Sequence, residues 1–186
     1  MNRREVVGRL ALMLGGSIIG AEFFLSGCKS DATRLNNLFT ADDIALFNEI
    51  SETILPETAT PGAKMANVGA FMALMVNDCY TPDEQTIFTN GVTVLNEQSN
   101  IMYGKNFMSI DAEQRTALLT ILDQEQKIEA KNSQHAVHYF RMMKELTLLG
   151  YFTSEVGCTK ALRYIPVPGK YVGCIPYRTG EKAWAT

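Results

Sequence analysis

Apolar residues recur at helical spacing along the chain from residue 40 onward. Thr40, with Asp43 three residues later, resembles a helix N-terminal capping box. Pro56 disfavours helical backbone in the residue before it, so the first pattern predicts a helix over residues 40–55. The apolar positions of this first segment are Ile44, Leu46, Phe47, Ile50 and Ile54.

The clearest local helix signal lies at residues 81–84. Thr81 suits an N-cap, Pro82 suits the first turn, and Glu84 completes a capping box, which predicts a helix running toward Tyr103. Three similar segments predict a second, mostly buried helix around residues 68–75, a fourth from about residue 111 and a fifth over about 134–150. Their apolar positions are Val68, Phe71, Leu74, Met75, Leu118, Leu119, Ile121, Leu122, Ile128, Val137, Phe140, Met143 and Leu146.

No segment alternates apolar and polar residues for long enough to require a strand. Residues 56–62, with two prolines and one glycine, predict a loop. The fold class expected is therefore all-α: a compact antiparallel bundle of about five helices followed by an irregular tail rich in Pro, Gly and aromatic residues. The expected domain spans residues 40–186, preceded by a linker at 28–39.

Residues 151–186 differ in amino-acid composition from the helical segments. They contain three prolines, four glycines and most of the late aromatic residues. A long irregular segment in a compact domain usually has a function, and rigid aromatic side chains give a large contact area at low entropic cost. Two interpretations follow: the tail packs back across the bundle, or it also contacts a partner.

The first 27 residues have the pattern of an export signal. A region with Arg3 and Arg4 precedes an apolar, Gly-rich stretch shorter than a membrane span, and Leu-Ser-Gly-Cys at residues 25–28 resembles a bacterial lipobox. Cys28 would then carry the lipid. The Arg3-Arg4 pair resembles a twin-arginine signal for folded proteins, although Asn2, Val6 and Val7 depart from it. An ordinary secretory signal or an uncleaved anchor is the alternative.

Composition excludes one class of function and restricts the cysteine chemistry. A net charge of −3 and the absence of a Lys/Arg-rich block argue against nucleic-acid binding. With Cys28 lipidated, Cys79, Cys158 and Cys174 remain in an oxidising compartment, so one disulfide and one free thiol are expected. Their spacings match neither a zinc nor a haem site.

The sequence shows little catalytic chemistry. His135 and His138 are spaced to share one helical face and could form half of a metal site, but a third ligand is not evident, and exposed helix residues explain them better. Nucleophile-elbow, dinucleotide-binding and phosphate-loop motifs are absent from the sequence. An exported subunit or binding module is the simplest interpretation, with a stand-alone lipid-anchored protein using His135 and His138 as the alternative.

Five sequence blocks together resemble the gluconate 2-dehydrogenase subunit 3 family. Each block alone is weak, but their order along nearly the whole mature chain is specific. The blocks are PETATPGA at 56–63, DCY at 78–80, GYFTSEVG at 150–157, Tyr164 with VPG at 167–169, and GCIP at 173–176.

The resemblance implies a role in a complex. Members of this family are small exported subunits of membrane-associated bacterial dehydrogenases for sugars and sugar acids. The large partner is an FAD-dependent flavoprotein of the glucose-methanol-choline (GMC) type, often with a cytochrome c subunit that carries haem. FAD and catalysis would then belong to the partner, and this chain, without a bound cofactor or metal of its own, would escort the folded flavoprotein on its twin-arginine signal to the periplasmic side of a membrane.

The resemblance also suggests roles for individual residues. Cys79 and Cys174 match family cysteine positions, which favours a disulfide between them over the competing Cys158–Cys174 pair.

The partner contacts that the resemblance implies fall in the tail. For the Gly-Tyr-Phe segment at residues 150–152 there is a rival explanation, namely that it caps the last helix and fills the core. The residues expected at or beside the flavoprotein interface are Tyr151, Phe152, Glu155, Tyr164, Pro168, Gly169 and Tyr171.

Overall fold

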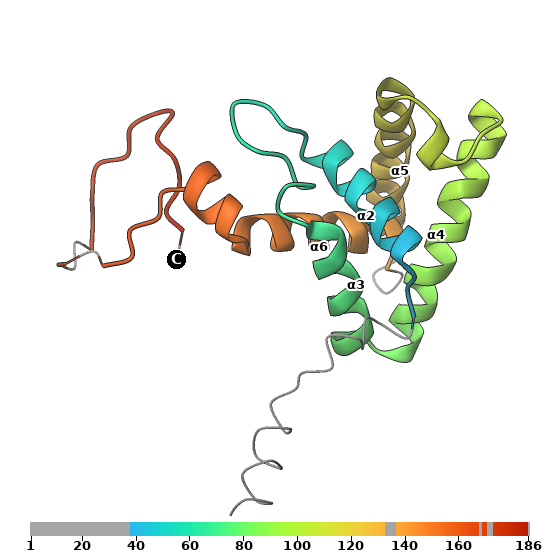
Figure 1. The fold of residues 1–186 in the computed structure, drawn as a ribbon, viewed down its shortest axis with the longest axis horizontal. Coiled ribbons are helices and arrows are strands. Elements are labelled where there is room, and N and C mark those ends of the chain that lie inside the picture. Colours follow the sequence, from blue (N-terminus) through green and yellow to red (C-terminus); the bar gives the residue numbers. More distant parts are fainter. Residues whose placement is uncertain (1–37, 133–136, 168, 171–172, 186) are drawn as a thin grey trace, which may run out of the picture. The chain divides into compact units, whose positions relative to one another are not determined.

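The computed structural model describes residues 38–132, 137–167, 169–170 and 173–185. In these residues the chain forms helices and one isolated β-bridge, without strands, which confirms the all-α prediction (Figure 1). The α-helices are α2 (Ala41–Ile54), α3 (Val68–Cys79), α4 (Pro82–Tyr103), α5 (Ala112–Asn132) and α6 (Tyr139–Thr153). Two short helices, the 3₁₀-helix η1 (Phe107–Ser109) and the π-helix η2 (Gly157–Ala161), follow α4 and α6.

Helices α2 and α4 begin at the residues that the capping boxes predict. The backbone N–H of Thr40 donates to the Asp43 carboxylate at 2.8 Å, and the Asp43 N–H donates back to the Thr40 hydroxyl at 3.3 Å. Thr81 and Glu84 form the same reciprocal pair at the start of α4, with distances of 2.9 and 3.4 Å. These bonds satisfy backbone donors that the first helical turn leaves unpaired. Both helix starts were therefore predicted correctly from local sequence.

An aromatic cluster joins α2 to α4 in the core. The ring of Phe47 meets the rings of Phe39 and Phe88 edge-on, with centroids 5.2 and 5.4 Å apart. Phe47 and Phe88 are fully buried. Edge-to-face aromatic pairs add specific geometry to the burial of large apolar areas. This cluster anchors α2 to α4, the longest of the described helices.

Helix α6 is the central element of the domain. It contacts each of the other α-helices, and Figure 1 shows it running across α3 and α2. Met143 and Leu146 on α6 are buried in the core.

At the surface, Lys144 donates to Asp123 of α5 at 2.5 Å, and Lys127 pairs with the same carboxylate. The hydrogen bonds from Lys127 and Lys144 lower the pKa of Asp123 to about 2.

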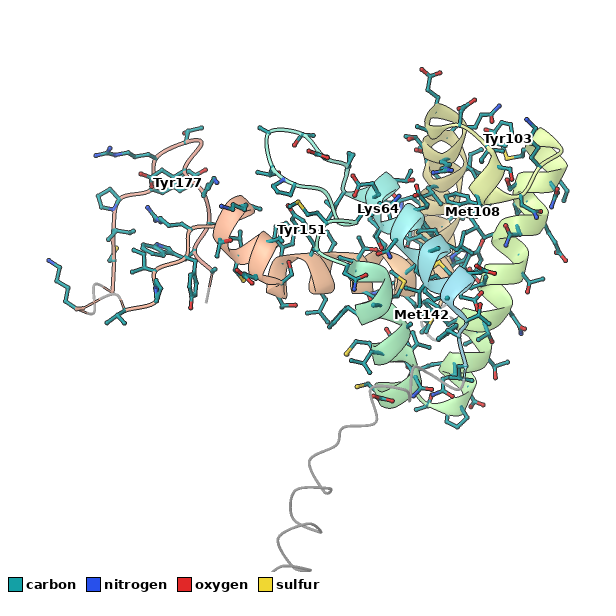
Figure 2. All side chains as sticks on the ribbon, viewed as in Figure 1. Lys64, Tyr103, Met108, Met142, Tyr151 and Tyr177 are labelled. Carbon is teal, nitrogen blue, oxygen red and sulfur yellow. The ribbon has the colours of Figure 1, made fainter. Side chains whose placement is uncertain are left out.

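Carboxylates of α2 hold the loop between α2 and α3, and Figure 2 shows Lys64 of this loop beside α2. Glu52 accepts hydrogen bonds from the backbone N–H groups of Glu57 and Lys64, at 2.9 and 2.7 Å. Glu49 pairs with Lys64 and, at 2.6 Å, with Arg115 of α5. The hydrogen bond from Lys64 and the charge of both cations lower the pKa of Glu49. The predicted loop is therefore an ordered part of the domain.

Two details of the predicted helices are wrong. Helix α6 begins at Tyr139, about five residues later than expected, because His138 caps it from outside the helix. Leu74 is 50% exposed, since the buried face of α3 follows the four-residue spacing of Val68, Met72 and Val76 and leaves Leu74 on the opposite side. Three other apolar positions assigned to helix faces are also exposed, namely Ile121, Ile128 and Val137.

Candidate partner-binding surface

Tyr151 lies in the core rather than on a partner surface. Its side chain is 4% exposed, and its hydroxyl donates a hydrogen bond to the carbonyl oxygen of Pro61 at 2.6 Å. This bond ties α6 to the loop after α2, two segments that are 90 residues apart in sequence. The rival interpretation of the Gly-Tyr-Phe block, filling of the core, is therefore the correct one for Tyr151.

We expect Tyr151→Phe to lower the free energy of unfolding by about 1 kcal/mol, because the carbonyl of Pro61 loses its donor. The ring stays in place, so binding to a partner should be unchanged. Urea unfolding followed by circular dichroism measures the first effect, and copurification measures the second. Loss of a copurifying partner without loss of stability would show that Tyr151 acts at an interface.

Residues 154–157 of the 150–157 block form the turn that follows α6. The Ser154 hydroxyl donates to the carbonyl oxygen of Tyr151 at 2.7 Å and accepts from the N–H of Gly157 at 3.0 Å. A Cβ atom on Gly157 would lie 1.9 Å from the Tyr151 carbonyl oxygen, so only glycine fits there. Turn geometry thus explains Ser154 and Gly157 of this block.

The other predicted interface residues within the described part of the chain are exposed. Phe152 is 38% exposed and packs edge-on against Tyr151, and Tyr164 is 49% exposed. Glu155 is exposed two residues beyond the end of α6, and Gly169 is exposed with a positive φ of 74°. Pro168 and Tyr171 lie outside the described residues. Phe152, Glu155, Tyr164 and Gly169 are thus accessible to a partner, unlike Tyr151.

Exposed apolar side chains are concentrated toward the C-terminal end. Nine of the twenty large apolar side chains exposed in the described residues lie after residue 147. Exposed apolar side chains that stand singly are ordinary on a protein surface, whereas a contiguous group of them marks a contact site. We call these nine the C-terminal apolar residues: Leu148, Leu149, Phe152, Tyr164, Ile165, Val167, Ile175, Tyr177 and Trp184.

The end of the tail folds back on Arg163, which lies two residues after η2. The N–H of Arg163 donates to the Ala183 carbonyl at 2.8 Å, and the N–H of Ala185 donates to the Arg163 carbonyl at 3.0 Å. The Arg163 guanidinium lies 3.9 Å from the centre of the Trp184 ring. Sequence reasoning missed Arg163, because its partners are some twenty residues away and no local pattern connects them.

The three cysteines of the described residues are free thiols. The expected Cys79–Cys174 disulfide and the competing Cys158–Cys174 pair are therefore both absent from the described structure. Cys79 and Cys174 are exposed, and the Cys158 thiol donates to the carbonyl oxygen of Phe152 at 3.2 Å. Cys158 thus takes part in closing the turn after α6, which explains its position without a disulfide.

His138, the described member of the predicted histidine pair, has a structural role. His138 is the N-cap of α6, where its Nδ1 accepts from the N–H of Phe140 at 3.2 Å, and its ring stacks on Tyr139. His135 lies outside the described residues. No cluster of three potential metal ligands occurs in the part of the chain that the structure describes. His138 is explained by capping and stacking.

The predicted signal and lipid sites, Arg3, Arg4 and Cys28, also lie outside the described residues, as does most of the predicted linker. Among the helices that are described, none is long and apolar enough to span a bilayer.

Comparison with known proteins assigns the chain to a family. The model of gluconate 2-dehydrogenase subunit 3 matches residues 41–169, from the start of α2 through η2 and into the tail. Searches of characterised proteins and of solved structures return no match. The matched range covers more than half of the chain and includes the turn after α6, Phe152 and Tyr164. The chain therefore belongs to the gluconate 2-dehydrogenase subunit 3 family.

Proposed function

We propose that this chain is the non-catalytic small subunit of an FAD-dependent sugar or sugar-acid dehydrogenase, such as gluconate 2-dehydrogenase. A family of dehydrogenase subunits implies a multi-subunit complex with a catalytic partner. The observation that carries the proposal is the concentration of exposed apolar side chains after residue 147. These side chains offer a partner a large contact area at one end of the chain.

The aromatic members of this set suit a permanent interface. Phe152, Tyr164, Tyr177 and Trp184 have few rotatable bonds, so burying them against a partner costs little side-chain entropy. Tyrosine and tryptophan also dominate the energetics of many protein interfaces. Because Phe152 is attached to the rigid end of α6, part of this surface is preorganised before the partner binds.

The chemistry of the complex is assigned to the partner. We place FAD and the oxidation of the sugar hydroxyl in a large flavoprotein of the GMC type, and haem c, where present, in a third subunit. Within the proposal this chain stabilises the flavoprotein and connects it to the membrane. The sugar substrate would thus be chosen by the partner and not by this chain.

Export and anchoring complete the proposal. Arg3 and Arg4 would direct the folded, FAD-loaded complex through the twin-arginine route, since a flavin inserted in the cytoplasm requires folded transport. Lipid on Cys28 would then hold the complex at the periplasmic face of a membrane, and one acyl chain contributes ~0.8 kcal/mol per buried CH₂ group.

The paired substitution Arg3→Lys and Arg4→Lys tests the escort role. We expect most of the dehydrogenase activity to remain in the cytoplasm, whereas the matched control Arg9→Lys should leave export unchanged because Arg9 lies outside the Arg3-Arg4 pair. Both variants conserve charge, so the comparison isolates the role of the pair. Activity is assayed in cytoplasmic and periplasmic-membrane fractions. Undiminished export of active dehydrogenase in the paired variant would contradict the escort role.

A further inference from the structure

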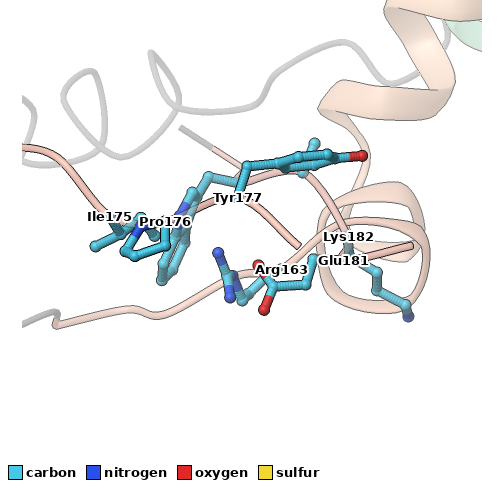
Figure 3. A pocket seen from close by; sticks show the side chains of 8 residues that line it. Arg163, Ile175, Pro176, Tyr177, Glu181 and Lys182 are labelled. Atoms are coloured by element: carbon cyan, nitrogen blue, oxygen red, sulfur yellow. The ribbon is translucent and has the colours of Figure 1, made fainter. Parts of the chain in front are cut away.

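A pocket of about 370 Å³ lies between Arg163 and the segment 175–184 of the tail (Figure 3). It falls within the size range of small-ligand sites. Most of its lining belongs to residues 175–184, beyond the range that matches the family model, and Arg163 supplies the opposite side. The described lining residues are Arg163, Ile175, Pro176, Tyr177, Glu181, Lys182, Ala183 and Trp184.

Arg163 is held firmly in the wall of this pocket. Its backbone is held on both sides by Ala183 and Ala185, and its guanidinium is stacked on the Trp184 ring at 3.9 Å. Among the described residues, the Nε atom of Arg163 is buried and has no hydrogen-bond partner. A buried donor without an acceptor is costly, so the described residues leave the Arg163 guanidinium incompletely hydrogen-bonded.

The charges around Arg163 restrict what an acceptor for it can be. Lys182 adds a second positive charge, although its ammonium group donates to the carbonyl of Lys160, and Glu181 adds one negative charge. The lining thus carries a net charge of about +1, which matches a singly charged anion better than a doubly charged phosphate. A planar guanidinium also fits the two oxygens of a carboxylate.

The remaining walls are apolar and accessible. Tyr177 is 79% exposed, and Ile175 and Trp184 are each 45% exposed. A ligand that carried only a charge would leave this surface in contact with water. Burial of an apolar group beside the carboxylate would therefore add to the binding free energy.

We propose that this pocket binds a carboxylate that is attached to an apolar group. Arg163 receives the carboxylate, and Tyr177, Ile175 and Trp184 contact the apolar part. Such a ligand has two sources, an acidic residue within an apolar segment of the partner subunit or a free carboxylic acid. The peptide source rests on the proposed function, whereas the chemistry of the pocket does not.

The chain contains a single tryptophan, Trp184, so its fluorescence reports on this pocket directly. The full-length chain is titrated with hexanoate, with hexanamide as the uncharged control. A second arm uses the blocked peptide acetyl-Leu-Asp-Leu-amide, with the corresponding Asn peptide as its control. We expect saturable changes for the two carboxylates and much weaker ones for the two amides.

Three variants assign the effect to individual charges. Arg163→Gln should weaken carboxylate binding by about tenfold or more, and Arg178→Gln, which alters an exposed arginine outside the pocket lining, should leave it unchanged. Glu181→Gln should strengthen binding by about threefold, because it removes the only negative charge of the described lining. This gain keeps the test decisive if Arg163→Gln fails to fold, which circular dichroism would reveal.

Tighter binding of the peptide than of hexanoate would support a partner segment as the source, and the reverse order would support a free acid. Equal binding of the amides, or undiminished binding by a folded Arg163→Gln variant, would overturn the proposal. Weaker binding by Glu181→Gln would do the same. Because the titration uses the isolated chain, its failure leaves the role in a dehydrogenase complex untouched.

Discussion

Replacing Phe152 and Tyr164 together by serine is expected to reduce the dehydrogenase that copurifies with the chain by about tenfold or more. Both side chains are exposed, so their removal leaves the core intact. Aromatic residues at the centre of an interface typically contribute more than about 1 kcal/mol each, and two such losses change affinity by at least tenfold. The measurement is dehydrogenase activity per mole of chain after purification from membranes.

Ile101→Ser provides the matched control. Ile101 is 77% exposed on α4, far along the sequence from the C-terminal apolar residues, and its replacement also removes one large apolar side chain. We expect this variant to retain the dehydrogenase. If the double variant keeps its partner while Ile101→Ser loses it, the interface lies on α4 and the assignment to the C-terminal residues is wrong.

Phe47→Ala is expected to lower the free energy of unfolding by about 3–5 kcal/mol, the range typical of a buried phenylalanine. Phe47 is fully buried, and its ring contacts both Phe39 and Phe88, so the substitution opens a cavity between α2 and α4. Leu74→Ala, in contrast, should cost less than about 1 kcal/mol, because half of this side chain is exposed. Urea unfolding of both variants gives the two values.

The comparison also tests the structure against the sequence pattern. The pattern alone places both Phe47 and Leu74 on buried helix faces, whereas the structure buries only the first. A cost for Leu74→Ala as large as that for Phe47→Ala would mean that α3 presents a different face to the core.

Local sequence was sufficient to predict those features of the fold that depend on interactions between neighbouring residues. The helix starts at Thr40 and Thr81 depend on residues three positions away, and both capping boxes form. The start of α6 was missed because an apolar Val137 extends the helical pattern, although the chain enters the helix only after His138. Periodicity describes which residues could face a core and does not show where the backbone becomes helical.

The candidate partner-binding surface was harder to predict than the helix starts, because it depends on contacts between residues that are distant in sequence. Tyr151 belongs to an aromatic and glycine-rich block that suggested an interface, but its hydroxyl bonds to a carbonyl ninety residues earlier and the side chain is buried. Arg163 and Trp184 likewise meet only because the tail folds back. Composition predicted exposed aromatic residues in the tail, and several of them are exposed. Which aromatic residues are exposed could be learned only from the tertiary structure.

The family was also identifiable from sequence, for a physical reason. The block at residues 150–157 is constrained by the turn after α6, where Ser154 bridges two backbone groups and Gly157 approaches the Tyr151 carbonyl too closely for a side chain. Such steric constraints leave recognisable sequence patterns. The motif therefore indicates the fold of the family, and the exposed residues around it carry the proposed interaction.

The central claim, that this chain is the small subunit of a flavoprotein dehydrogenase, is tested most directly by purifying the tagged full-length chain from its native membrane in mild detergent. The absorbance spectrum and the mass of the copurifying protein are recorded together. The account predicts a flavin spectrum and a partner several times larger than this 186-residue chain. A colourless chain recovered without a partner would contradict it.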